Sequence, residues 1–183
     1  MEAMTVMPRE SRDWTVDDLD LLPDDGLQYE LLDGILLVSP APVPNHQRLA
    51  RGLFRLLDAA CSYDRFEVFF APIDWQPDTR TSLQPDVLVV AIDRTGPKNI
   101  TEPLALAVEV LSPSTRRKDM VLKRSKYEDA GVTSYWVVDP AGPTVTALEL
   151  REGRYVEVGT ATGTQTLSVR LPFPVSISPS GLL

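Results

Sequence analysis

Residues 104–140, LALAVEVLSPSTRRKDMVLKRSKYEDAGVTSYWVVDP, contain the pattern that decides the fold. Residues 104–111 form a nearly continuous apolar run, which is typical of a strand buried on both faces of a sheet. Residues 116–131 have the pattern of a helix that Gly131 ends, and residues 133–138 favour a second strand. The order strand, helix, strand predicts a right-handed crossover between two parallel strands of one sheet.

The segments before this stretch extend the same sheet. Leucines recur at helical spacing over residues 46–60, with Asn45 as a candidate N-cap, and arginines occupy the other side of this predicted helix. FEVFFAPIDW (66–75) and PDVLVVAID (85–93) are strand candidates, the second of them for the centre of the sheet. Together with residues 104–140 they give the order αβββαβ, a mixed sheet flanked by helices. The fold class is therefore α/β (α+β).

Hairpins are expected at both ends of this core. Asp33-Gly34 suits the positive φ angles of a tight turn between two short strands, and TVTALEL and RYVEVG predict a hairpin near the C-terminus. We expect one domain over 1–183, because the length suits one domain of ordinary size. It comprises a lead-in segment (1–25), a core (26–140), and a C-terminal hairpin and tail (141–183).

Composition excludes several classes of protein. A hydrophobic content of 43% with 24% charged residues is that of a folded globular chain. One cysteine, Cys61, and one histidine, His46, leave no intramolecular disulfide and no Cys/His zinc cluster. No apolar run is long enough to span a bilayer, so no membrane association is expected and a cytoplasmic protein is favoured. The formal charge of −8 argues against coating nucleic acid through overall charge.

Glu109 is the most informative single residue, because it interrupts an otherwise apolar strand. An unpaired buried carboxylate costs several kcal/mol, so Glu109 needs a compensating partner. Hard cations such as Mg²⁺ prefer oxygen ligands, and Asp86, at the start of another predicted strand, supplies a second carboxylate for such an ion. The alternative is purely structural: Asp86 caps a strand and Glu109 pairs with a basic residue of a helix.

A basic run follows the Glu109 strand. Residues 116–126 carry six basic residues against the single acid Asp119, a charge of +5, so the rest of the chain carries −13. A local positive field beside candidate metal ligands suits a polyanionic substrate. The alternative is a solvated helix face, which is the usual explanation of a charge run.

Several blocks of the chain resemble the Uma-two family of restriction endonuclease-like proteins, over roughly residues 12–160. They are YELLDG, SPAPVPNHQRL, PDVLVV, VEVLSPSTRRKD and KRSKYEDAGVTSYWVVDP. That family belongs to the PD-(D/E)XK nuclease superfamily, whose core has the αβββαβ order. The resemblance implies that Asp86 and Glu109 are catalytic metal ligands. It departs at Leu111, where the superfamily pattern has a lysine; members of this family typically carry that lysine on the following helix, where Lys123 lies.

Helix geometry supports this placement of the lysine, because Asp119, Lys123 and Tyr127 are spaced by four and share one face. A surface pair between Asp119 and Lys123 is the alternative. Glu30 and His46 lie in blocks that resemble the family and, with Tyr127, are second-tier site residues; Glu30 could instead face solvent, and His46 could be a cap. The expected nucleic-acid contacts are Arg116, Arg117, Lys118, Arg124 and Lys126.

The resulting hypothesis is a Mg²⁺- or Mn²⁺-dependent endonuclease that hydrolyses phosphodiester bonds, with DNA as the favoured substrate. The first alternative is a noncatalytic module that uses the same fold to bind nucleic acid or protein. The second is a metal-dependent phosphoesterase acting on a small nucleotide. A homodimer is a further expectation, since restriction-type cleavage of a duplex often needs two active sites.

Overall fold

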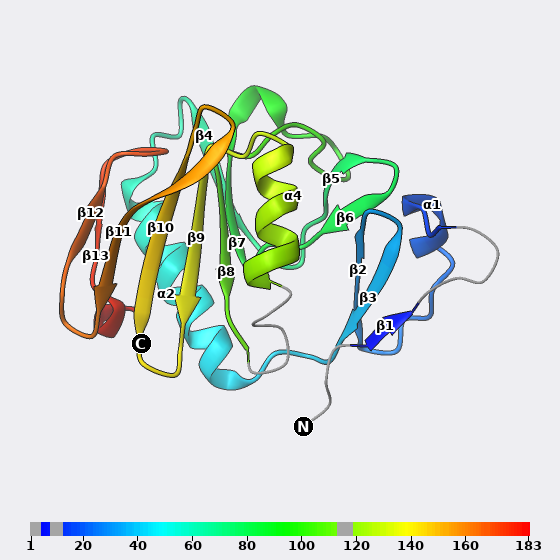
Figure 1. The fold of residues 1–183 in the computed structure, drawn as a ribbon, viewed down its shortest axis with the longest axis horizontal. Helices are drawn as coiled ribbons and strands as arrows, with labels where there is room; N and C mark the ends of the chain where they lie inside the picture. The colour runs from blue at the N-terminus through cyan, green and yellow to red at the C-terminus, as the bar shows by residue number, and fades with distance from the viewer. Residues whose placement is uncertain (1–4, 8–12, 113–118) are drawn as a thin grey trace.

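Two β-sheets, with a short helix between them, form the body of the protein. The computed structural model describes residues 5–7, 13–112 and 119–183. Figure 1 shows the larger sheet and the smaller sheet side by side, with helix α4 (Arg124–Asp129) lying in front of the space between them. A short helix, α1 (Val16–Leu19), lies outside the smaller sheet.

The larger sheet is the mixed sheet that the sequence predicts. Its strand order is β11-β10-β9-β8-β7-β4, and β8 and β9 are its one parallel pair within the described residues. The strands are β4 (Phe66–Phe70), β7 (Val87–Ala91), β8 (Leu106–Val110), β9 (Ser134–Asp139), β10 (Thr144–Arg151) and β11 (Arg154–Thr162). Strand β8 lies in the middle of the order beside β9, β7 lies between β8 and the edge strand β4, and all five residues of β8 are buried. The predicted fold class and the parallel crossover are therefore confirmed.

The smaller sheet was only partly foreseen. Its order is β1-β3-β2-β6-β5, all antiparallel. Its strands are β1 (Thr5–Met7), β2 (Gln28–Leu32), β3 (Ile35–Ser39), β5 (Trp75–Asp78) and β6 (Thr81–Leu83). The predicted strand over 66–75 is wrong as one element, because the chain leaves the larger sheet at Ala71-Pro72 and enters the smaller one as β5. The predicted Asp33-Gly34 turn is present, with φ angles of 50° and 84°.

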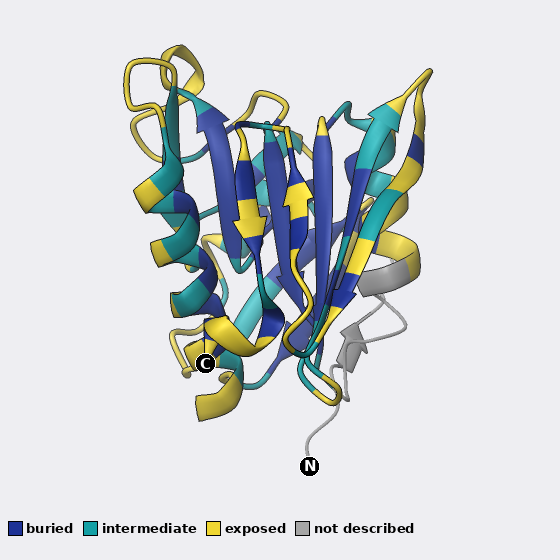
Figure 2. Cartoon of the chain, turned by 90° about the vertical axis from the view of Figure 1, so that its left-hand side faces the viewer, coloured by how far each residue is buried: buried dark blue, intermediate teal, exposed yellow. Residues whose placement is uncertain are grey.

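One long helix, α2 (Pro44–Ala60), covers one face of the larger sheet. Its buried leucines, Leu49, Leu53 and Leu57, recur at the predicted helical spacing, and the helix packs on β4, β7 and β8. Figure 2 shows the buried residues of this helix turned toward the sheet and the exposed ones turned outward. Gly52 lies where the helix meets the C-terminal segment: a Cβ there would stand 2.1 Å from the carbonyl oxygen of Leu182, so only glycine permits this approach.

The opposite face of the larger sheet packs against α4 and the smaller sheet. A π-helical turn (Asp119–Lys123), labelled η2, leads directly into α4. Such turns occur often at functional sites. The remaining elements are β12 (Leu167–Val169) paired with β13 (Val175–Ile177), and the 3-10 turns η1 (Ile92–Arg94) and η3 (Pro179–Leu182). Among the described residues, no helix is long and apolar enough to cross a membrane.

Candidate metal and catalytic site

The register between β7 and β8 brings the two candidate metal ligands together. Val87 is opposite Val108, and continuing this pairing by one position places Asp86 opposite Glu109. Directly opposed residues present their side chains on the same face of a sheet. The backbone N–H of Val110 donates to Oδ2 of Asp86 at 2.7 Å, which fixes that carboxylate against β8. Two residues far apart in sequence thus become neighbours.

Glu109 receives two side-chain donors from the following helical segment. Its carboxylate is buried, with 3% exposure, on the face of β8 that packs against α4. Nζ of Lys123 lies 3.2 and 3.3 Å from its two oxygens, and the Tyr127 hydroxyl donates to Oε1 at 2.7 Å. Lys123 is itself 4% exposed, so its ammonium lies inside the protein and not on a solvated helix face. The spacing of four between Lys123 and Tyr127 therefore does place both on the face that meets the strand.

Glu30 completes the cluster from the smaller sheet. Nζ of Lys123 donates to its Oε1 at 2.9 Å, and the backbone N–H of Gln84 donates to the same oxygen at 2.8 Å. Glu30 is 3% exposed, because β2 lies between β3 and β6 and does not form an edge. The solvent-facing alternative for Glu30 is thus excluded. Sequence reasoning missed Gln84, and no sequence signal marks a residue that acts through its backbone N–H.

Carboxylates predominate in this cluster among the described residues. The ammonium of Lys123 lies between Glu109 and Glu30, and Asp86 adds a third carboxylate, which also contacts His46. Carboxylate oxygens gathered at a largely buried position are the ligands that a hard divalent ion prefers. Burial, with the neighbouring Glu109 carboxylate, raises the pKa of Tyr127 well above its ordinary value, so this hydroxyl stays protonated and keeps donating.

An aromatic row holds Tyr127 in place. Its ring lies 5.2 Å from the ring of Trp75 in the smaller sheet and 5.2 Å from that of Tyr135 on β9. Tyr135 in turn lies 5.8 Å from Tyr155. Aromatic rings at these separations attract one another beyond their area of burial. The row connects both sheets beneath the charged cluster.

His46 approaches the site from the N-terminal end of α2. Its Nε2 lies 3.2 Å from Oδ2 of Asp86, with both side chains largely buried. Pro44 at the first helical position and the preceding prolines direct the chain into α2 so that the first turn reaches β7. His46 therefore contacts a candidate site residue from within the first turn. The N-cap of α2 is Val43, so the predicted cap at Asn45 and the alternative of a cap at His46 are both wrong.

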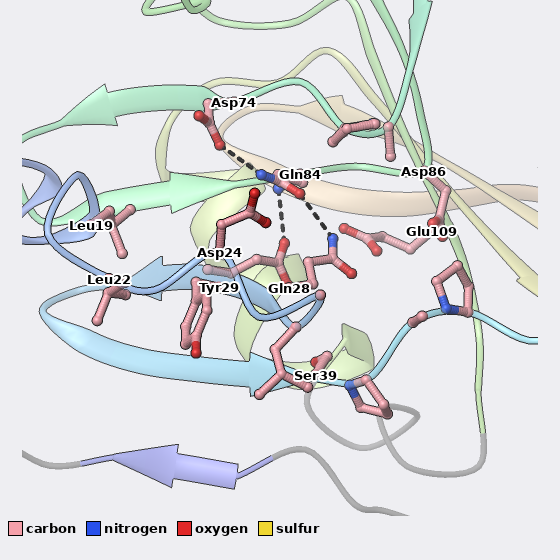
Figure 3. A pocket seen from close by; sticks show the side chains of 18 of the residues that line it. Leu19, Leu22, Asp24, Gln28, Tyr29, Ser39, Asp74, Gln84, Asp86 and Glu109 are labelled. Carbon is pink, nitrogen blue, oxygen red and sulfur yellow. Dashed lines mark hydrogen bonds between the residues drawn. The ribbon is translucent and has the colours of Figure 1, made fainter.

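These residues open into one large pocket of about 1250 Å³, which Figure 3 shows from close by. Glu30, His46, Asp86, Glu109 and Lys123 all line it. Gln84 lies in the wall between Gln28 and Asp74, accepting from Gln28 Nε2 at 3.1 Å and donating to Asp74 Oδ1 at 2.9 Å (Figure 3). The pocket therefore combines a charged end, at the candidate site, with a wall of hydrogen-bonding amides.

Arg124 and Lys126, two of the described basic residues after the Glu109 strand, make different contacts. Lys126 lies 2.7 Å from carboxylate oxygens of both Asp33 and Asp78, so its ammonium links α4 to two turns of the smaller sheet. Although burial opposes it, the hydrogen bonds that Lys126 donates to these two carboxylates raise its pKa. Both partners lie far from Lys126 in the sequence, and the phosphate contact of Lys126 stays a prediction. Arg124 is exposed and donates to the carbonyl of Tyr155 at 3.4 Å. Arg116, Arg117 and Lys118 lie outside the described residues.

The donor set is of the kind that a hard divalent cation uses. Asp86 and Glu109 offer carboxylate oxygens, and one or two carboxylates with water and substrate phosphate commonly complete a Mg²⁺ site. Among the described residues, no three side chains of His, Cys, Asp and Glu converge closely enough to form a metal cage by themselves. The residues present therefore fit an ion held partly by substrate and water, and they do not fit a closed structural site.

Comparison with known proteins places this arrangement in a family. The profile of the Uma2 family, described as "Putative restriction endonuclease", matches residues 16–180, which is most of the chain. The chain belongs to the Uma2 family. No curated protein matches the chain.

One solved structure similar to this Uma2 protein is that of a putative nuclease of the DUF820 family from Anabaena variabilis. The TM-score is 0.69 with 17% sequence identity, and the alignment covers 92% of this chain and 96% of that chain. At this identity the likeness shows the fold, which is consistent with the restriction endonuclease-like superfamily. In the Uma2 chain, Leu111 at the superfamily's lysine position is buried in the core, while Lys123 reaches Glu109 from the helix.

Proposed function

We propose that this Uma2 protein is a divalent-metal-dependent endonuclease that hydrolyses phosphodiester bonds in DNA, with Mg²⁺ or Mn²⁺ as its metal. One observation carries the proposal. The opposed residues Asp86 and Glu109 line the same pocket as the buried Lys123, whose ammonium contacts both Glu109 and Glu30. Carboxylates beside a positioned cation are the components that metal-assisted phosphodiester hydrolysis requires.

Asp86 and Glu109 would hold the ion. When bound, a divalent cation supplies polarisation of a phosphoryl oxygen and a lowered pKa for a bound water. The backbone N–H of Val110 orients Asp86, and the Tyr127 hydroxyl orients Glu109, so neither carboxylate needs to reorganise during the reaction. His46 adds a second contact to Asp86.

Lys123 would act on the substrate side of the same site. Its ammonium lies between Glu30 and Glu109, where it can donate to an attacking water or to a phosphoryl oxygen as negative charge develops there. Glu30 keeps this ammonium in place and is a positioning residue. Arg116, Arg117, Lys118 and Arg124 remain proposed phosphate contacts. Cleavage of both strands of a duplex would require two such sites, for which a homodimer is the simplest arrangement.

Glu109→Gln tests the proposal directly, because it keeps the size of the side chain and removes its charge. Plasmid DNA, linear DNA, RNA and nucleotides are incubated with the protein in Mg²⁺, in Mn²⁺ and in chelator. We expect metal-dependent cleavage of DNA by the wild type and a loss of about 100-fold or more in Glu109→Gln. Glu152→Gln, at an exposed turn between β10 and β11, is the matched control and should cleave normally.

Three outcomes would contradict the proposal. Cleavage that persists undiminished in Glu109→Gln would remove the assignment of the site. DNA binding without any metal-dependent cleavage would favour a noncatalytic module of the same fold, and hydrolysis of nucleotides alone would favour a phosphoesterase. Melting temperatures of both variants, measured alongside, separate loss of activity from loss of folding.

A further inference from the structure

A second, smaller pocket lies next to the candidate site, on the side of α2. Its volume is about 470 Å³, within the range of sites that hold a small organic ligand. Gln47, Ala71 and Asp86 line both this pocket and the larger one. A chain-like substrate whose reacting group lies at Asp86 would therefore continue into the smaller pocket.

Two arginines line the pocket from the outer side of α2. Arg48 and Arg51 are three positions apart, which makes them neighbours on the helix surface, and both are exposed. Neither forms an ion pair within the part of the chain that the structure describes. On a protein with a formal charge of −8, this pair of unneutralised guanidinium groups beside Asp86 is a local site for anions.

An exposed aromatic side chain faces the same pocket. Phe70 ends the edge strand β4 with 58% of its surface exposed, and its ring lies 4.8 Å from that of Phe54 at an interplanar angle of 69°. Phe54 packs against the core, whereas Phe70 belongs to neither core cluster. The edge-on contact with Phe54 limits the orientations of Phe70 and leaves it accessible to another ring.

We propose that Arg48, Arg51 and Phe70 form a binding site for single-stranded nucleic acid that flanks the bond to be cleaved. The arginines would contact backbone phosphates, and Phe70 would stack on an unpaired base. Guanidinium groups interleaved with an exposed aromatic ring are the combination by which proteins bind single strands without regard to sequence. The inference rests on the proposed function for its placement of the scissile bond at Asp86.

Binding of a labelled oligothymidylate, measured by fluorescence anisotropy in chelator over a series of salt concentrations, tests the site without cleavage. Arg48→Gln/Arg51→Gln should weaken binding and lower the slope of log affinity against log salt by about 1.4. This corresponds to about 0.7 for each phosphate of a single strand that the variant no longer neutralises. Phe70→Ala should weaken binding about tenfold with little change in slope, because stacking releases no counterions.

Arg94→Gln is the matched control, since Arg94 is an exposed arginine in η1, at the opposite end of β7 from Asp86. It should bind as the wild type does. All substituted side chains are exposed, and equal melting temperatures would verify that the variants fold. The site is overturned if the arginine and Phe70 variants bind as the wild type does, or if Arg94→Gln loses as much affinity. A Phe70→Ala loss that is equal on blunt duplex DNA would overturn the assignment to single strands.

The same variants in metal separate this inference from the proposed function. If the wild type shows Glu109-dependent cleavage but Arg48→Gln/Arg51→Gln cleaves the oligothymidylate with unchanged KM, the flanking site is wrong and the nuclease stands. If the wild type cleaves nothing, but its binding in chelator still depends on these arginines and Phe70, the nuclease is wrong and the single-strand site stands.

Discussion

The two faces of the larger sheet differ in chemistry although the same strands supply both. The face under α2 is a continuous apolar layer, in which Val108 and Val110 of β8 pack against the leucines of the helix. On the other face the intervening residue, Glu109, meets Lys123, Tyr127 and, through Lys123, Glu30. Alternation along one short strand thus serves packing on one side and chemistry on the other. We expect substitutions on the first face to change stability and those on the second to change activity.

The largest change in stability is expected where this division is weakest, at Lys123 itself. Lys123→Met leaves Glu109 and Glu30 buried without their shared cation, so the free energy of unfolding should fall by about 3–5 kcal/mol. Denaturant unfolding at neutral pH measures this. Adding Glu30→Gln removes the charge of one of these two buried carboxylates and should recover part of the lost unfolding free energy. A double variant no more stable than Lys123→Met would show that charge burial is not the cause.

On the apolar face, Leu53→Ala should cost about 3 kcal/mol, because it removes a fully buried side chain from the layer between α2 and the sheet. The melting temperature should fall by roughly 10 °C for a chain of this size. Cleavage measured well below that temperature should be unchanged per folded molecule. A large loss of activity in folded Leu53→Ala would mean that the two faces are not independent.

Tyr127→Phe should have a smaller effect on stability, of about 1.5 kcal/mol, since it removes one hydrogen bond to a charged group and keeps the ring between Trp75 and Tyr135. Its effect on cleavage should exceed its effect on unfolding, because Glu109 loses the donor that orients it. Comparison of kcat and unfolding free energy for the same preparation checks this. Small changes of equal size in kcat and in the unfolding free energy would show that Tyr127 contributes only packing.

The smallest effect is expected at Lys126, which is close to Lys123 in sequence but links surface turns. Lys126→Met should lower stability by about 1 kcal/mol at pH 7, with Arg124→Met as an exposed control close to the wild type. Hydrogen bonds, among them the one from Lys126, hold the pKa of Asp78 below its ordinary 3.8, although burial alone would raise it. The pKa of Lys126 is raised above 10.5, although burial alone would lower it.

The pH dependence of this link follows from those two directions. A lowered carboxyl pKa contributes stability that is present above about pH 4 and is lost as the pH falls through the folded-state pKa; a raised lysine pKa contributes stability that is lost only above about pH 10. The difference in melting temperature between wild type and Lys126→Met should therefore be constant near neutrality and shrink in acid. A difference that persists at about pH 2 would indicate packing of the lysine stem instead.

Local pattern predicted most elements and the pairing of strands that follow one another, such as β8 with β9, but not the pairing of β2 with the distant β6. The leucine spacing of α2, the Asp33-Gly34 turn and the apolar run of β8 depend on residues close in sequence, and all three are present. Glu30 alternates with apolar neighbours in a way that suits an exposed edge as well as a buried strand. Its burial depends on β6 pairing with β2, and β6 lies much further along the chain.

Lys123 and Lys126 show the same difference between contacts that are local in sequence and contacts that are not. A spacing of four put Lys123 on the face with Tyr127, so its contact with Glu109 was predictable once the helix was expected above that strand. For Lys126, helix geometry predicted only that the side chain lies on a different face of the helix from Lys123 and Tyr127. Its partners, Asp33 and Asp78, belong to a sheet whose assembly the sequence does not reveal, so these two ion pairs could not be predicted.

The register of β7 against β8 also determines where this gene can gain or lose codons. The exposed connection over residues 92–98 lies outside the pairing that faces Asp86 with Glu109, and lengthening a loop costs little free energy. One residue inserted between Asp86 and Val89 would instead turn Asp86 to the opposite face of the sheet, against α2, with the later pairing of β7 intact. Length variation in natural relatives should therefore collect in that connection and be absent from the strand.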